Sequence, residues 1–169
     1  RYWLFKSEPY TWGWDHQVAR GEQGEEWDGV RNYQARNFMR NMALGERIFS
    51  NIHKIKVIVG VVEVIALAHP NSTSDDLRWE CVDIKAISVV DPPLTLVQIK
   101  HDPRLSAMML VKNLRLSVQP VSEAHWRIIG CQLQTLVYDP DFKPQRVTRD
   151  ESHWFTRHHN FILKNMGAQ

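Results

Sequence analysis

Residues 27–37 read Trp-Asp-Gly-Val-Arg-Asn-Tyr-Gln-Ala-Arg-Asn. This stretch indicates more about the fold and the function of the chain than any other part of it. It begins with a tryptophan that is followed by a glycine turn. Asn32 stands at the position of a helix N-cap, and the apolar spacing after it predicts an amphipathic helix from Tyr33 to Met42. The stretch therefore predicts a turn that leads into a capped helix, with Arg31 before the cap and Arg36 inside the helix.

Each part of this stretch has a physical use in binding nucleic acid. A helix N-terminus presents unpaired N–H groups and the positive end of its dipole to a phosphate. Arg31 and Arg36 add planar donors for a phosphate or a base edge, while Trp27 and Tyr33 offer rings on which a base can stack. Two polar side chains suit the edge of an unstacked base: Asp28 and Asn32. A structural interpretation also stands, in which Trp27 and Tyr33 are core aromatics and the arginines pair with upstream acids.

Alternating apolar residues and proline stops predict strands around this helix. Strands are expected at Tyr2–Lys6, Arg47–Phe49, Ile55–Ala68, Trp79–Val90 (ended by Asp91-Pro92-Pro93) and Leu114–Val118 (ended by Pro120). Short helices are expected at Leu94–Lys100 and from the Ser122 cap to Leu133, and a loop at Thr11–Gly29. Because strands and helices follow no βαβ rhythm, the expected fold class is α+β, a small mixed β-barrel decorated with short helices.

The composition is that of an ordinary globular domain, with 169 residues of which 43% are hydrophobic and 24% charged. The longest apolar run, Val57–Ala68, contains Glu63 and is shorter than the roughly 20 residues that cross a bilayer. Cys81 and Cys131 lie far apart in no metal-type spacing, which favours small buried thiols in a reducing compartment. The first residues already resemble a strand rather than a signal peptide. An intracellular location, cytoplasmic or nuclear, is expected, with no membrane contact.

Basic residues are gathered in blocks, although the net charge is only +2. Residues 31–56 hold six Lys or Arg against the single acid Glu46, and residues 98–119 hold four against Asp102. Such blocks suit a face that binds phosphate, and they equally suit scattered, solvated charges.

Four segments resemble the signature segments of the EVE domain family. They are YWLFKSEP at Tyr2–Pro9, WDGVRNYQARN at Trp27–Asn37, VGVVEV at Val59–Val64 and RLSVQP at Arg115–Pro120. The resemblance runs from Tyr2 to Leu133 and implies a PUA-like barrel, related to YTH and ASCH domains, over residues 1–134. It also implies a cleft for DNA or RNA, in which family members are thought to recognise modified bases, including methylated cytosine derivatives. No catalysis and no cofactor are expected.

The resemblance, carried over position by position, places the cleft on residues from several segments. Tyr33 is added to them because a base can stack on its ring. The candidate nucleic-acid-binding and base-binding residues are Ser7, Glu8, Trp27, Asp28, Val30, Arg31, Asn32, Tyr33, Arg36, Ser50, Asn51, Arg115, Ser117 and Gln119. Arg115, Ser117 and Gln119 share a period of two and are expected on one face of a strand. One departure concerns the family's Phe-Tyr-His-Ser-Asn stretch, because this chain reads Ile-Phe-Ser-Asn-Ile-His over residues 48–53.

Residues 135–169 have no counterpart among these segments. Their aromatic and aliphatic side chains are too many for a solvated tail, so this extension is expected to pack on the barrel or on a partner chain. Its histidines, His153, His158 and His159, fit no standard ligand spacing, and no metal is expected.

Two other functions stay open on the sequence. An enzyme acting on a nucleobase or nucleotide would use Asp28 or Glu8 as general acid or base, which requires a carboxylate of raised pKa in a closed pocket. An adaptor would hold a peptide or small ligand in the aromatic cleft. Neither a Gly-x-Ser-x-Gly elbow nor a glycine-rich phosphate loop is present. The leading hypothesis is a non-enzymatic module for a modified or flipped base.

Overall fold

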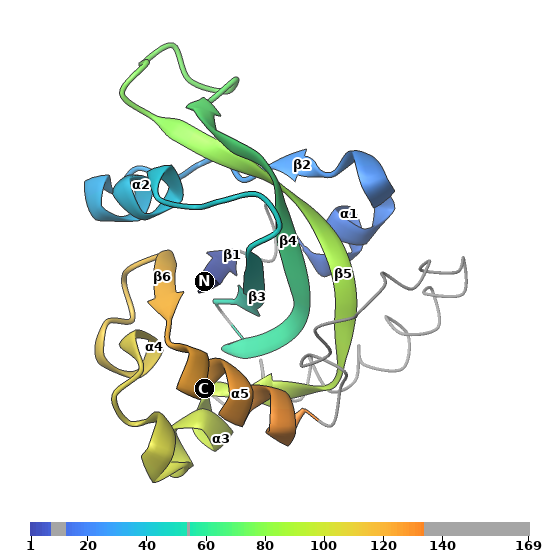
Figure 1. The fold of residues 1–169 in the computed structure, drawn as a ribbon, viewed down its shortest axis with the longest axis vertical. Coiled ribbons are helices and arrows are strands. Elements are labelled where there is room, and N and C mark those ends of the chain that lie inside the picture. Colours follow the sequence, from blue (N-terminus) through green and yellow to red (C-terminus); the bar gives the residue numbers. More distant parts are fainter. Residues whose placement is uncertain (8–12, 54, 134–169) are drawn as a thin grey trace.

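A computed structural model of the chain describes residues 1–7, 13–53 and 55–133. Within them, a six-stranded mixed sheet runs in the order β2-β5-β4-β3-β1-β6 (Figure 1). Its strands are β1 (Tyr2–Ser7), β2 (Glu25–Glu26), β3 (Arg47–Ile52), β4 (Val57–Pro70), β5 (Glu80–Thr95) and β6 (Val118–Val121). The helical segments are α1 (Trp14–Ala19), η1 (Gly21–Gln23), α2 (Tyr33–Arg40), α3 (Leu96–His101), η2 (Pro103–Leu105), α4 (Met109–Lys112) and α5 (Glu123–Gln132).

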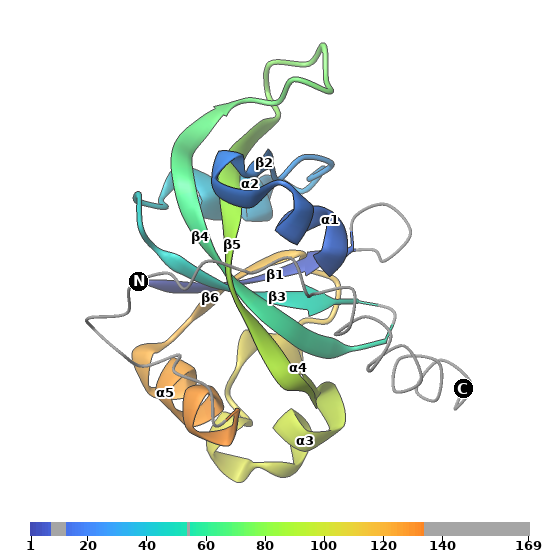
Figure 2. The ribbon, with the colours of Figure 1, turned by 90° about the vertical axis from the view of Figure 1, so that its right-hand side faces the viewer.

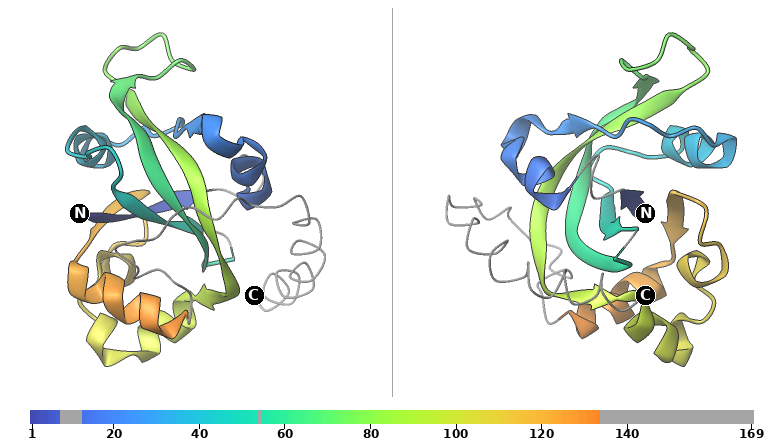
Figure 3. Two further views of the ribbon diagram at one scale, coloured as in Figure 1. Left: turned by 45° about the vertical axis from the view of Figure 1, so that its right-hand side comes forward. Right: turned by 180° about the vertical axis from the view of Figure 1, so that it is seen from behind.

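The long β4–β5 hairpin is the frame on which the other elements are arranged (Figure 2). Its pairing shifts register at several points, and such bulges bend and twist a strand. The helices α3, α4 and α5 gather at one end of the hairpin, while α1 and α2 lie toward the other (Figure 3). β1 lies between β3, to which it runs parallel, and β6, to which it runs antiparallel.

The sheet is open, so the expectation of a closed β-barrel is wrong, whereas the α+β class is confirmed. The two edges are β2 and β6, and in the described residues these strands are not paired with each other. β2 has only two residues, and β6 contains Pro120, which has no N–H group to donate to a neighbouring strand. Neither edge can therefore carry the continuous ladder that closing the sheet would require.

The apolar core lies on both faces of the sheet. Trp3 and Phe5 of β1 point into one cluster, which α1 and α2 cover, and Leu4 points into the other. The second cluster is centred on Trp126 of α5, whose ring stacks on Tyr2 at 4.4 Å and on Phe49 at 3.9 Å between centroids. Strands buried on both faces read as continuous apolar runs, as the first six residues of β4 do.

Residue patterns in the sequence predicted the starts of two helices correctly. Asn32 caps α2 by accepting a hydrogen bond from the Ala35 N–H at 3.0 Å, and Ser122 caps α5 in the same way through His125. The predicted loop at Thr11–Gly29 is wrong in part, because α1, η1 and β2 lie within it. β5 continues through Asp91–Pro93, where the register with β4 jumps from Gly60–Val89 to Ile58–Leu94. The prolines lie in this bulge, where no ladder hydrogen bond is needed.

The short α4 was not predicted. The extension over residues 135–169 lies outside the described residues, as does Glu8. Among the described helices, none combines the length and the apolar character that crossing a membrane requires.

Gly60 in β4 makes a close contact that a larger residue cannot make. A Cβ atom at this position would overlap the indole ring of the buried Trp14. We expect Gly60→Ala to lower the free energy of unfolding by about 1–3 kcal/mol, the usual cost of overpacking a core. Urea denaturation measures the effect. In a double-mutant cycle with Trp14→Leu, the two changes in unfolding free energy should not add, since the smaller side chain relieves the overlap. Purely additive effects would contradict this explanation.

Candidate nucleic-acid interface

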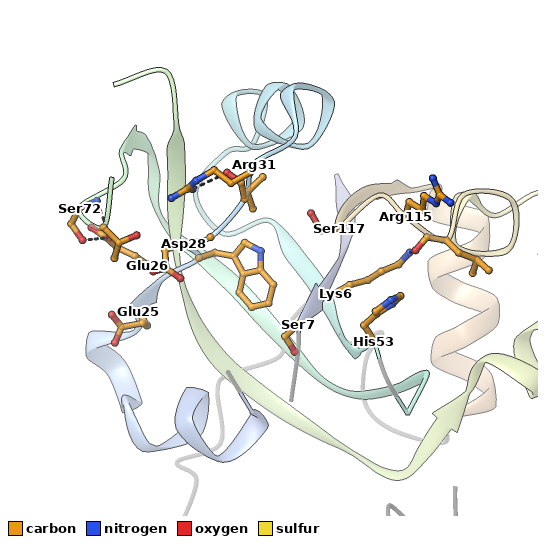
Figure 4. A pocket seen from close by; sticks show the side chains of 15 residues that line it. Lys6, Ser7, Glu25, Glu26, Asp28, Arg31, His53, Ser72, Arg115 and Ser117 are labelled. Carbon is orange, nitrogen blue, oxygen red and sulfur yellow. Dashed lines mark hydrogen bonds between the residues drawn. The ribbon is translucent and has the colours of Figure 1, made fainter. Parts of the chain in front are cut away.

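A hollow of about 710 Å³ lies where the end of β1, the segment after β2 and the turn before β6 meet. His53, after β3, and the loop between β4 and β5 complete its wall (Figure 4). The lining residues are Lys6, Ser7, Glu25, Glu26, Trp27, Asp28, Gly29, Val30, Arg31, His53, Ser72, Thr73, Leu114, Arg115 and Ser117.

Trp27 lines the hollow next to Glu26 and Asp28, its neighbours in the chain, and is also part of the core. Its side chain is only 7% exposed and packs against Phe5, with 4.9 Å between the ring centroids. Its backbone N–H donates to the Val82 carbonyl at 2.8 Å. The two interpretations of this residue, core aromatic and wall of a binding site, are therefore compatible: Trp27 is a rigid floor for the hollow.

Gly29 determines how the chain leaves Trp27. Its φ of 74° is a left-handed conformation that glycine adopts without steric cost. On either side of this turn, Asp28 is exposed and Val30 is buried. The turn thus presents one carboxylate to solvent at the rim and one apolar side chain to the interior.

Lys6, His53 and Arg115 form one end of the hollow, called here the basic end (Figure 4). Lys6 is almost fully buried, and its Nζ donates to the Leu114 carbonyl at 2.9 Å and to the Asn113 carbonyl at 3.3 Å. Burial disfavours the ammonium form and lowers the pKa of Lys6 to about 8. The basic end therefore holds one cation whose charge depends on pH near neutrality.

Glu25, Glu26 and Asp28 form the opposite, acidic end, beside Ser72 (Figure 4). Ser72 donates to Glu26 through its hydroxyl at 2.5 Å and through its backbone N–H at 3.3 Å. Glu25 forms an ion pair with Arg20. Within the described part of the chain, Asp28 forms neither a hydrogen bond nor an ion pair, so its carboxylate is available to a ligand.

Backbone hydrogen bonds hold the walls between the two ends. The Lys6 N–H donates to the Ser117 carbonyl and the His53 N–H to the Ser7 carbonyl, each at 2.9 Å. The hollow is therefore a site with a tryptophan floor, a cationic end and an anionic end, and its walls are formed by segments that are distant in sequence.

The family of the chain follows from comparison with known proteins. The model of the EVE domain matches residues 1–132. This chain belongs to the EVE domain family. Mouse thymocyte nuclear protein 1 is 31% identical over an alignment of 161 positions, which covers 76% of this chain and 71% of the mouse protein. That relative is named a nuclear protein; the compartment of this chain stays a prediction.

Solved structures support the same assignment. The crystal structure of a protein from Agrobacterium tumefaciens is 48% identical, with a TM-score of 0.77 over 84% of this chain and 98% of that one. The crystal structure of human THYN1 protein in complex with 5-methylcytosine containing DNA is 28% identical, with a TM-score of 0.70 over 79% of this chain and 98% of that one.

The EVE domain brings only part of the predicted site residues to the hollow. Those that line it are Ser7, Trp27, Asp28, Val30, Arg31, Arg115 and Ser117. Those described elsewhere in the fold are Asn32, Tyr33, Arg36, Ser50, Asn51 and Gln119. The role of each residue in binding stays a prediction, because position alone does not test it.

Tyr33 and Arg36 belong to a ladder of rings and guanidinium groups outside the hollow. Tyr33 stacks on Trp79 with 5.1 Å between centroids, and the Arg36 guanidinium lies 5.0 Å from the Tyr33 ring centre. Arg31 lies 5.7 Å from the Trp79 ring centre, so it belongs both to the ladder and to the rim of the hollow. The predicted stacking of a base on Tyr33 would have to compete with these existing ring contacts.

Three predicted site residues on β3 and β6 are buried in the fold and do not line the hollow. Ser50 and Asn51 are buried in β3, and Gln119 is only 1% exposed in β6. The expectation that Arg115, Ser117 and Gln119 share one face of a strand is wrong, because β6 begins only at Val118. Gln119 turns inward and donates to the carbonyls of Asn113 at 2.7 Å and Leu116 at 2.9 Å. It thereby positions the turn that carries Arg115 and Ser117.

Several lining residues were missed in the sequence. They are Lys6, Glu25, Glu26, His53, Ser72, Thr73 and Leu114. A signal existed for Lys6, a lone cation in an otherwise apolar strand segment, and for Glu26, the acid next to Trp27. His53, Ser72 and Thr73 reach the hollow only through strand pairing, which no local pattern reveals.

We expect Gln119→Leu to lower the free energy of unfolding by about 1–3 kcal/mol, because two carbonyls lose a buried donor. Gln34 on the exposed face of α2 provides the matched control. Gln34→Leu should change stability by no more than about 0.5 kcal/mol. Denaturant unfolding compares the two variants, and equal effects would show that Gln119 does not hold the turn.

Proposed function

We propose that this EVE domain binds nucleic acid and holds one nucleotide, drawn out of its base stack, in the hollow above Trp27. The observation that carries the proposal is the arrangement of a tryptophan floor between a basic and an acidic end. A nucleotide has the complementary arrangement, with a flat base in the middle, a phosphate at one end and a polar base edge at the other. A volume of about 710 Å³ also falls in the range of pockets that enclose small molecules.

The basic end suits the phosphate. Arg115 is exposed there, and Lys6 lines the same end with an ammonium group that has one N–H beyond the two that donate to the Asn113 and Leu114 carbonyls. Arg31 at the rim donates to the Val30 carbonyl at 3.0 Å and forms no ion pair among the described residues, so its charge is free to meet a phosphate. Contacts of this kind provide most of the affinity for nucleic acid and position the ligand.

The acidic end suits a base that carries an exocyclic amine. Carboxylates accept hydrogen bonds, and the amino groups of cytosine and adenine donate them. The Asp28 carboxylate is unpaired within the described residues and stands beside the floor, while thymine would present it with a carbonyl instead. Binding of a cytosine derivative is supported by the relative of known structure, the human THYN1 protein in complex with 5-methylcytosine containing DNA.

The exposure of Asp28 favours binding over catalysis. A general acid or base at this position would need a carboxylate withdrawn from water, so that its pKa moves toward neutrality. Asp28 is instead exposed at the rim. We therefore propose a binding module rather than an enzyme, tested by titrating oligonucleotides that differ only in cytosine methylation. Tight binding without turnover of a nucleotide panel supports this proposal, and binding that ignores salt concentration contradicts it.

Trp27→Leu should weaken binding of a methylcytosine oligonucleotide by about 5- to 150-fold, the equivalent of 1–3 kcal/mol of lost stacking. Arg31→Ala should also weaken it, because a rim charge is removed. Arg40→Ala is the control, since Arg40 lies on α2 in an ion pair with Glu80 and does not line the hollow. Fluorescence anisotropy at fixed salt measures the affinities, and thermal unfolding verifies that each variant is folded. An effect of Arg40→Ala as large as that of Arg31→Ala would refute the assignment.

Binding should weaken as pH rises through about 8, because Lys6 loses its charge there instead of near 10.5. The protonated form attracts phosphate, so affinity is highest below the folded pKa and falls above it. We expect a decrease of roughly tenfold between pH 7 and 9.5, the size of one charge-assisted hydrogen bond. Lys6→Met is the control: His53 and Arg115 line the same end in both proteins, so a pH dependence that the variant keeps does not come from Lys6. A wild-type profile identical to that of the variant would exclude Lys6 as a phosphate contact.

A further inference from the structure

Three neighbouring strands bring four metal-ligating side chain types to one place on the sheet. Cys81 and Asp83 are two residues apart on β5 and therefore share a face of the strand. β4 places His69 opposite Cys81, and β2 places Glu26 opposite Asp83. Because paired residues of adjacent strands point to the same face, the register alone gathers a thiol, an imidazole and two carboxylates.

The distances show that three of these side chains lie close together and that the fourth, Asp83, adjoins His69. The ligand atoms of Glu26, His69 and Cys81 all lie within 4.8 Å of one another. The Cys81 sulfur lies 3.9 Å from Nε2 of His69, and the same nitrogen lies 2.8 Å from Oδ1 of Asp83. Cys81 is fully buried, while the other three residues are half-buried, so an ion could enter from the side of the carboxylates and the imidazole.

We propose that Glu26, His69, Cys81 and Asp83 form a binding site for a thiophilic divalent metal ion of the Zn²⁺ class. A set of one thiolate, one imidazole and carboxylates is one that Zn²⁺ and Co²⁺ bind readily, whereas Mg²⁺ and Ca²⁺ require oxygen ligands alone. Two carboxylates beside a buried sulfur also form a negatively charged environment, which a divalent cation compensates.

Small movements bring the side chains to coordination distance. Tetrahedral Zn²⁺ with ordinary bond lengths separates a nitrogen from a sulfur by about 3.6 Å and a nitrogen from an oxygen by about 3.3 Å. The present separations are 3.9 Å and 2.8 Å, so the first shortens by roughly 0.3 Å and the second lengthens by roughly 0.5 Å. The ion takes the position of the proton that His69 and Asp83 now share, and both this proton and the thiol proton of Cys81 leave to solvent.

The site is distinct from the proposed nucleotide contacts but shares Glu26 with the hollow. An ion held by Glu26 reduces the negative charge of the acidic end without occupying the floor above Trp27. The proposal does not depend on nucleic-acid binding, because the metal alone is the probe in its test.

The test is a titration of the full, chelator-treated chain with Co²⁺, followed by displacement with Zn²⁺. We expect one Co²⁺ per chain with a near-ultraviolet charge-transfer band from thiolate to cobalt, which only a cysteine ligand produces. Cys81→Ser should abolish the band. Glu26→Gln and His69→Gln should each weaken Zn²⁺ binding by at least about tenfold, in keeping with the sensitivity of metal sites to their ligand shells.

Cys131→Ser is the matched control, because Cys131 is the exposed free cysteine of α5 and is remote from the cluster in the fold. It should keep the band at full intensity. Absence of a thiolate band in the wild-type chain, or its loss in Cys131→Ser instead of Cys81→Ser, would overturn the proposal. Circular dichroism of each variant distinguishes loss of a metal-binding side chain from loss of the fold. Glu26→Gln tests the site at a half-buried position, where the substitution does not disturb the core.

Discussion

The ammonium group of Lys6 is the constraint on which the shape of the hollow depends. β1 is buried on both faces, so a cation at its end has to find acceptors inside the protein. It finds them in the carbonyls of Asn113 and Leu114, and Gln119 donates to Asn113 from the neighbouring strand. These bonds attach the turn before β6 to the end of β1, and that turn carries Arg115 and Ser117. One buried charge thus links the core of the sheet to the wall of the site.

The distribution of charges in the EVE domain explains why a net charge of +2 is compatible with the proposed nucleic-acid site. Part of the basic blocks seen in the sequence is neutralised locally: Arg40 pairs with Glu80 and Arg104 with Asp102. The cations at the hollow, Lys6, Arg31 and Arg115, have neutral acceptors as their hydrogen-bonding partners or lie exposed to solvent. The electric field in the hollow therefore depends on where the unpaired charges lie, on either side of Trp27. It does not depend on the net charge of the chain.

Local chemistry could be predicted from the sequence, and long-range pairing could not. The Asn32 cap, the helix after it and the turn at Gly29 follow from residue types at fixed spacing, and the structure contains them. The segment before β6 was misread because Arg115, Ser117 and Gln119 alternate like a strand, although only Gln119 lies in one. The Gln119 amide donates to two buried carbonyls, and the alternation of residue types along the sequence gives no sign of these hydrogen bonds. Closure of the sheet was misjudged for a similar reason, since a two-residue edge strand leaves almost no trace in a sequence.

The structure also favours a site that is formed before its ligand arrives. Trp27 is fixed by Phe5 on one side and by the backbone of Val82, so its ring loses little conformational freedom when a base stacks on it. Exposed side chains at the two ends, Asp28 and Arg115, must by contrast be ordered on binding, which reduces what each contact contributes. In the proposed mode of binding, recognition is divided between two kinds of residue: a rigid ring on which a flat base stacks, and exposed charged groups that select its orientation. Because the ring belongs to the hydrophobic core, the stability of the fold and the precision of the site have the same physical origin.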